Sequence, residues 1–203
     1  MKRFRISALL ATMVAATFLV AGLPSSAPCE EGVDDARLKQ IVVEANEIRN
    51  PDSGFEIKLW TEDNKKTYVI KDTIAFKFKA NRDCYVTLLD IGTDGTVYKI
   101  FPNKWHKSSK VKKDRVYVIP PEDSKFRFRV RGPVGVEYVK AIATADPTQA
   151  TRDREAEEDE FSEMKDADVA MKNIKIELDK KAKKDWAETV VSFKVKRQAD
   201  DED

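Results

Sequence analysis

The sequence predicts a mainly β fold, a two-layer antiparallel immunoglobulin-like β-sandwich with one late amphipathic helix. Apolar and polar residues alternate with period two through much of residues 55–145, as expected for strands that bury one face. Glycine, proline and aspartate punctuate these runs at short intervals, which indicates turns. The strand-like runs do not alternate with helical segments. A sheet packed on a sheet is therefore favoured over a parallel α/β fold.

The stretch 76–103, FKFKANRDCYVTLLDIGTDGTVYKIFPN, is predicted to form the central hairpin. Residues 84–91 are apolar on both faces, which is typical of a central strand. Asp94 and Gly95 form a strong short-range turn signal, because glycine adopts positive φ without cost. Pro102 must end the second strand, since it lacks a backbone donor.

The other elements are predicted around this hairpin. Further strands are expected within residues 55–59, 68–70, 74–78, 115–119, 126–130 and 136–144. A helix is expected at 155–171, because Phe161, Met164, Ala167 and Met171 are three or four residues apart. Closing strands are expected at 173–178 and 187–196, although residues 161–178 could instead form one longer helix. The single domain then covers residues 51–197, and an acidic tail follows at 198–203.

Residues 1–27 have the pattern of a secretory signal peptide. Lys2, Arg3 and Arg5 precede an apolar run at 6–22, and small and polar residues follow. A retained N-terminal membrane anchor is the alternative, since the run is barely long enough to span a bilayer. We therefore expect a periplasmic or secreted protein that is possibly membrane-anchored. Residues 28–50 are expected to be a linker with one short helix or strand.

Charge and cysteine content narrow the classes of function. Residues 1–27 hold three basic residues and no acid, so their removal changes the net charge from +1 to −2. A chain with nearly equal numbers of acidic and basic residues lacks the net positive charge that would favour binding to nucleic acid. Cys29 and Cys84 are the two cysteines, and we expect them not to pair, because Cys84 lies in a predicted strand where a buried thiol is ordinary. Lipid modification of Cys29 is a less favoured alternative.

Aromatic and basic residues give the candidate interaction surface. Trp105 lies in a lysine-rich loop at 104–114, and Arg127, Arg129 and Arg131 fall on one face of a predicted strand. Each feature also has a structural explanation, a solvated loop in the first case and the wet face of an outer strand in the second. The candidate interaction residues are Trp60, Trp105, Lys107, Lys110, Lys112, Lys113, Arg127, Arg129 and Arg131.

No catalytic, cofactor or metal site is expected. His106 is the only histidine, and it has no neighbours at metal-ligand spacing. Glu157 and Glu160 could serve glycoside chemistry, but they lie in an acid-rich segment that indicates a solvated helix surface. Asp90 and Asp94 could suggest a calcium loop, yet their spacing does not supply the further oxygens that calcium needs.

The strings YVTLLDIGTDGTVYKIFPN and GPVGVE carry a resemblance over residues 55–145. The chain resembles a family of uncharacterised bacterial domains of unknown function. The matching residues are Tyr85, Gly95, Phe101, Pro102, Asn103, Gly132, Pro133, Gly135 and Glu137. The resemblance implies an exported protein and an accessory role, because members also occur as modules beside kinase-like or peptidase-like domains. It transfers no catalytic residue, and each matched residue also has a structural explanation, such as a turn at glycine or a loop cap at Asn103.

Together these observations predict an exported, non-enzymatic β-sandwich that binds a partner protein or a cell-envelope component. We expect a monomer that binds no nucleic acid and no cofactor. The alternatives are attachment of the basic loop to an anionic surface and, less favoured, an uncharacterised hydrolase.

Overall fold

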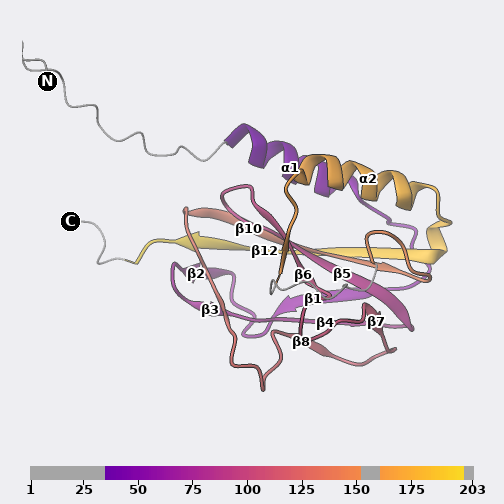
Figure 1. Cartoon of the computed structure of the whole chain (residues 1–203), viewed down its shortest axis with the longest axis horizontal. Helices are drawn as coiled ribbons and strands as arrows, with labels where there is room; N and C mark the ends of the chain where they lie inside the picture. Colours follow the sequence, from indigo (N-terminus) through magenta and orange to yellow (C-terminus); the bar gives the residue numbers. More distant parts are fainter. Residues whose placement is uncertain (1–34, 152–160, 199–203) are drawn as a thin grey trace, which may run out of the picture. The chain divides into compact units, whose positions relative to one another are not determined.

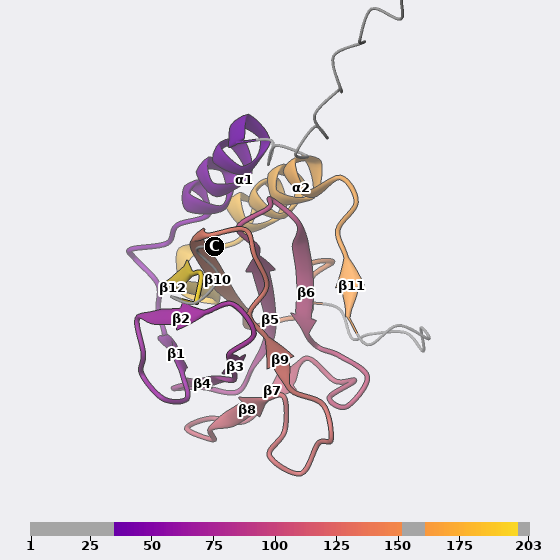
Figure 2. The same cartoon turned by 90° about the vertical axis from the view of Figure 1, so that its left-hand side faces the viewer.

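The computed structural model describes residues 35–151 and 161–198, which belong to one compact unit, Gly32–Asp203. The predicted mainly β sandwich is confirmed. A three-stranded sheet faces a seven-stranded sheet, and two helices cover the opposite side of the larger sheet (Figures 1 and 2). The larger sheet is therefore the middle layer.

The smaller sheet has the order β1-β4-β8 and is antiparallel throughout. Its strands are β1 (Ile57–Thr61), β4 (Phe76–Ala80) and β8 (Tyr117–Ile119). Two short strands, β3 (Thr73–Ile74) and β9 (Phe128–Arg129), form a separate antiparallel pair. The strand expected at 126–130 is thus only two residues long.

The larger sheet has the order β11-β6-β5-β10-β12-β2, and β7 also pairs with β5. Its strands are β2 (Thr67–Val69), β5 (Cys84–Ile91), β6 (Val97–Phe101), β7 (Lys110–Val111), β10 (Gly135–Thr144), β11 (Ser162–Glu163) and β12 (Trp186–Lys196). β5 lies in the interior of the sheet, as predicted. One pair at the edge of this sheet departs from the antiparallel pattern, because β12 and β2 run parallel.

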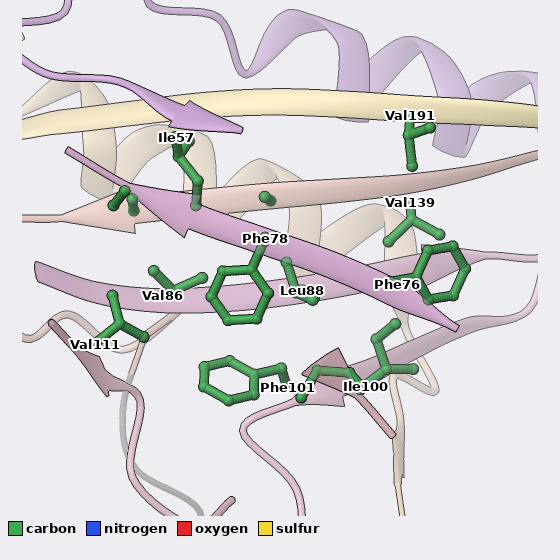
Figure 3. Close-up of a cluster of buried hydrophobic side chains, with 14 of the residues drawn as sticks. Ile57, Phe76, Phe78, Val86, Leu88, Ile100, Phe101, Val111, Val139 and Val191 are labelled. Carbon is green, nitrogen blue, oxygen red and sulfur yellow. The ribbon is translucent and has the colours of Figure 1, made fainter. Parts of the chain in front are cut away.

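The core between the two sheets follows from the period of two. Inward residues of β4 and β5, such as Phe76, Phe78, Val86 and Leu88, are almost completely buried. Figure 3 shows the Phe78 ring between these strands, near Phe101 of β6, and the two ring centroids are 5.0 Å apart. Alternating apolar side chains thus form the contact between the layers.

The helices α1 (Asp35–Glu47) and α2 (Ala167–Asp179) cover the outer face of the larger sheet. The helical alternative for residues 28–50 is confirmed, with Ile41 and Ala45 buried. The strand expected at 173–178 is wrong, because these residues belong to α2. The helix expected at 155–171 begins only at residue 167, and a short 3₁₀ turn, η1 (Lys183–Asp185), leads into β12.

Several sequence-based predictions lie outside the described residues, namely the signal peptide at 1–27, Cys29, and the segment with Glu157 and Glu160. Cys84 is a buried free thiol, and burial raises its pKa to about 12. No helix within residues 35–151 and 161–198 is long and apolar enough to cross a membrane.

Candidate functional site

Two acidic residues interrupt the apolar inner face of the larger sheet. On β5, the inward row Cys84, Val86 and Leu88 continues to Asp90, and on β10 Glu137 precedes inward Val139. Asp90 pairs in register with Val139, so Glu137 is its diagonal neighbour on the adjacent strand. Diagonal neighbours on one face are close enough for long side chains to meet. Strand pairing therefore brings the two carboxyls together.

These carboxyls lie in a pocket with a volume of about 520 Å³. Its lining comes from β5, the following turn, β6, the start of β10 and the segment 126–132, together with Phe161 before β11. The lining residues are Asp90, Gly92, Thr93, Asp94, Thr96, Tyr98, Ile100, Phe126, Arg127, Phe128, Arg129, Arg131, Gly132, Glu137 and Phe161. The volume is in the range of small-molecule sites and side-chain pockets. We call this feature the acid pocket.

Asp90 and Glu137 form a directly hydrogen-bonded carboxyl pair. Burial raises the pKa of Glu137 to about 9, and the charge of Asp90 adds to the effect. Burial also raises the pKa of Asp90 to about 7, although its hydrogen bond with Glu137 opposes the rise. At neutral pH Glu137 is thus the protonated donor and Asp90 the acceptor. Oδ1 of Asp90 is buried and has no hydrogen-bond partner within the described chain.

Two turns at this end of the sheet are tied together beside the pocket. Gly95 has a φ of 81° in the β5–β6 turn, and Asp94 Oδ1 accepts a hydrogen bond from the Thr96 backbone N–H. The Thr93 hydroxyl donates to the Pro133 carbonyl at 2.7 Å, so the turn before β10 is fixed to the turn after β5. This arrangement positions Asp94 and Glu137 at one site.

The segment 126–132 supplies three arginines to the pocket rim. Arg127 donates to the carbonyls of Ser124, Phe126 and Glu122, so it stabilises its own loop. Arg129 and Arg131 are exposed, and neither has an ion-pair partner among residues 35–151 and 161–198. Their guanidinium groups are available at the surface.

Aromatic rings form a continuous wall beside these arginines. Trp105 stacks on Phe126 with 5.1 Å between ring centroids. The centroid of the Phe161 ring lies 5.3 Å from that of Phe126 and 5.0 Å from that of Phe128. We call Trp105, Phe126, Phe128 and Phe161 the aromatic cluster. All four side chains are only half-buried, so the cluster is a partly exposed apolar surface, and three of its rings, Phe126, Phe128 and Phe161, line the pocket.

Comparison with known proteins identifies part of this region. Residues 67–147 match the model of a family described as Domain of unknown function (DUF4384). No curated protein and no solved structure matches the chain. The resemblance to an uncharacterised family is therefore confirmed. The DUF4384 match runs from β2 to just beyond β10 and includes both members of the carboxyl pair.

Most motif residues within the DUF4384 match have structural roles. Asn103 is fully buried; its Nδ2 donates to the Ile100 carbonyl, and its Oδ1 accepts from the backbone N–H groups of Trp105 and His106. The predicted loop cap is confirmed. Phe101 and Pro102 are buried beside it, and the Lys110 Nζ lies 6.0 Å from the centroid of the Tyr85 ring. Gly132 lines the acid pocket, the Pro133 carbonyl accepts the Thr93 hydrogen bond, and Gly135 is the first residue of β10.

Glu137 departs from this pattern, because it lines the acid pocket instead of only bracing a turn. The sequence suggests Asp90 only as a calcium ligand and does not reveal its pairing with Glu137. The available signal was an acid at an inward position of an otherwise apolar strand. Within the described chain, no group of three or more acidic, histidine or cysteine side chains is arranged to hold a metal ion.

The remaining candidate residues lie apart from the acid pocket lining. Trp60 is half-buried on β1 of the smaller sheet. Lys107, Lys110, Lys112 and Lys113 are exposed. Asp83 binds part of this loop, since it pairs with Lys112 at 3.0 Å and accepts the Lys113 backbone N–H. The centroid of the His106 ring lies 6.0 Å from that of Phe101. Burial and the nearby positive charge of Arg115 lower the pKa of His106.

A second hollow, of about 340 Å³, lies on the helix side of the larger sheet. The buried positive charge of Lys140 is paired with a negative charge there, because Lys140 Nζ is 2.8 Å from Glu188 Oε2. The acid pocket differs in that no lysine or arginine of the described chain pairs with its carboxyls. We therefore take the acid pocket as the candidate site.

Proposed function

We propose that this protein is an exported, non-enzymatic module that binds a partner protein of the cell envelope through the acid pocket and the aromatic cluster. The signal-peptide pattern of residues 1–27 supports export. The half-buried aromatic side chains and the exposed arginines beside them are residue types enriched at protein interfaces.

The observation that carries this proposal is the carboxyl pair itself. Burial of acidic groups costs stability, and both strands use apolar residues at the next inward positions, Leu88 and Val139. A strand with only a structural role would be more stable with apolar residues in place of Asp90 and Glu137. We infer that the pair is retained for binding.

The geometry supports binding over hydrolysis. The pocket lining contains no serine, cysteine or histidine within the described residues, so it lacks the usual nucleophile and base. The carboxyls of glycosidases are about 5 Å apart or more, whereas Asp90 and Glu137 are in direct hydrogen-bond contact. Recovery of a cleaved partner would instead favour hydrolysis by the carboxyl pair.

Site-specific photocrosslinking of the full chain in intact cells tests the proposal. A photoreactive amino acid replaces Lys125, an exposed residue next to Phe126 that does not itself line the pocket. The matched control replaces Ile176, which is 54% exposed on α2 across the larger sheet. We expect one abundant crosslinked partner from position 125 and none from position 176. Equal crosslinking from both positions, or none from 125, contradicts the proposed face.

The basic loop supports a second candidate function, attachment to an anionic surface. Its exposed lysines favour this alternative, although Asp83 neutralises part of their charge. A third photoreactive position, at Lys107, distinguishes the two functions. Crosslinks from 107 to membrane components, with none from 125, would favour attachment through the loop.

A further inference from the structure

We infer that the acid pocket receives the cationic side chain of a lysine or arginine from the partner, and that acidic residues beside this cation contact Arg129 and Arg131. The inference rests on the proposed function and names the chemistry of the partner segment. Three features of the pocket carry it: its floor, its walls and its rim.

The floor provides unused acceptors for a cation. Oδ1 of Asp90 is buried without a hydrogen-bond partner in the described chain, and the carboxylate of Asp94 lines the same pocket. A buried acceptor left unsatisfied is destabilising, and an ammonium or guanidinium group supplies the missing donors. No basic residue of the chain itself forms an ion pair there among residues 35–151 and 161–198.

The walls suit the stem and the charge of such a side chain. Phe126, Phe128 and Phe161 line the pocket together with Tyr98. Aromatic faces attract organic cations, and the methylene groups of lysine and arginine pack well on apolar surface. A small inorganic cation would use the carboxylates and leave this aromatic wall without a role.

The rim carries the opposite charge to the floor. Arg129 and Arg131 line the pocket but do not neutralise the carboxyl pair, whose pKa values are raised. A ligand with only positive charge would be repelled by the rim. A basic side chain flanked by acidic residues satisfies both regions, because its carboxylates can pair with the arginines.

Binding of a cation is expected to release a proton from the pair. Glu137 is protonated at neutral pH, and a positive charge beside it favours its ionised form. The other charged or titratable groups that face the pair are Asp90 on β5, Asp94 in the turn, Tyr98 on β6, and the arginines of segment 126–132. Affinity should therefore increase as the pH rises from 6 to 8.

The test titrates the full exported chain with acetyl-Glu-Lys-Glu-amide, followed by NMR chemical shifts of the pocket residues. The matched probe replaces lysine with norleucine, which keeps the apolar stem and removes the charge. We expect the lysine peptide to bind about tenfold more tightly, a difference of about 1.4 kcal/mol, and Asp90→Asn to abolish that preference. Glu122→Gln, an exposed substitution outside the pocket lining, should leave it unchanged.

Equal affinity for the lysine and norleucine peptides, or an unchanged preference in Asp90→Asn, would overturn the inference. This result is separable from the proposed function. If a partner is crosslinked at position 125 while the two peptides bind equally, the binding face stands and only the inference about the cation fails. Affinity that does not change between pH 6 and 8 would also contradict displacement of the Glu137 proton.

Discussion

Replacing Glu137 with glutamine is expected to raise the free energy of unfolding by about 3 kcal/mol at pH 7 and to leave it unchanged near pH 4. The folded pKa of Glu137, about 9, lies above its ordinary value of 4.5. The side chain therefore contributes stability that is fully present below pH 4.5 and is lost as the pH rises toward 9. Glutamine does not titrate and retains an N–H donor for Asp90.

Urea denaturation of the wild type and of Glu137→Gln between pH 4 and pH 9 measures this effect. The exposed acid Glu122 provides the control, because Glu122→Gln should change stability by less than about 0.5 kcal/mol at every pH. A difference between wild type and Glu137→Gln that is equal at pH 4 and pH 7 would mean that Glu137 is not protonated in the folded protein.

Replacing Phe78 with alanine is expected to lower the free energy of unfolding by about 3 to 5 kcal/mol. Phe78 is fully buried between the sheets. Its ring centroid lies 5.0 Å from that of Phe101 and 5.3 Å from that of Tyr117. The substitution leaves a cavity where strands of both sheets meet, and the surrounding rings can fill it only in part.

Thermal or urea unfolding of Phe78→Ala and Phe126→Ala separates the core from the aromatic cluster. Phe126 is half-buried, so its removal should cost less than half as much as removal of Phe78 while it disrupts the stacking with Trp105. Equal losses of stability for the two variants would make the aromatic cluster a part of the core instead of a surface kept for binding.

The β-sandwich could be predicted because the residue pattern of each main strand identifies it without knowledge of its partner strands. The alternation of Phe76 and Phe78 with lysines defines an inward face whatever its partner is, and the Asp94-Gly95 turn fixes the β5–β6 hairpin locally. The parallel pairing of β12 with β2 has no such local signal. It depends on packing between residues far apart in the sequence.

Residues 173–178 were expected to form a strand but belong to α2, because their apolar residues fit both structures. Ile174, Ile176 and Leu178 fit a strand by alternation, whereas Met171, Ile174 and Leu178 fit a helix by spacing. The larger sheet decides between them, because it buries the second set and leaves Ile176 exposed. Two periodicities shared by one short segment cannot be separated without the surface against which it packs.

Only some features of the acid pocket could be predicted from the sequence. Period two places Asp90 on the inward face of β5, beyond Leu88. Its contact with Glu137, however, depends on the register of β5 with β10, and the role of Phe161 depends on a segment beyond the DUF4384 match. The arginines at 127, 129 and 131 were predicted as one face, but their place on the rim of an acidic pocket was not predictable.

The role of the carboxyl pair in binding is tested most directly by comparing partner capture by the wild type and by the double variant Asp90→Asn/Glu137→Gln. Both chains carry the photoreactive amino acid at position 125 and are compared at equal amounts of folded protein. We expect at least about tenfold less capture by the double variant, which we also expect to be no less stable at pH 7. Undiminished capture by the double variant would contradict a role of the carboxyl pair in binding.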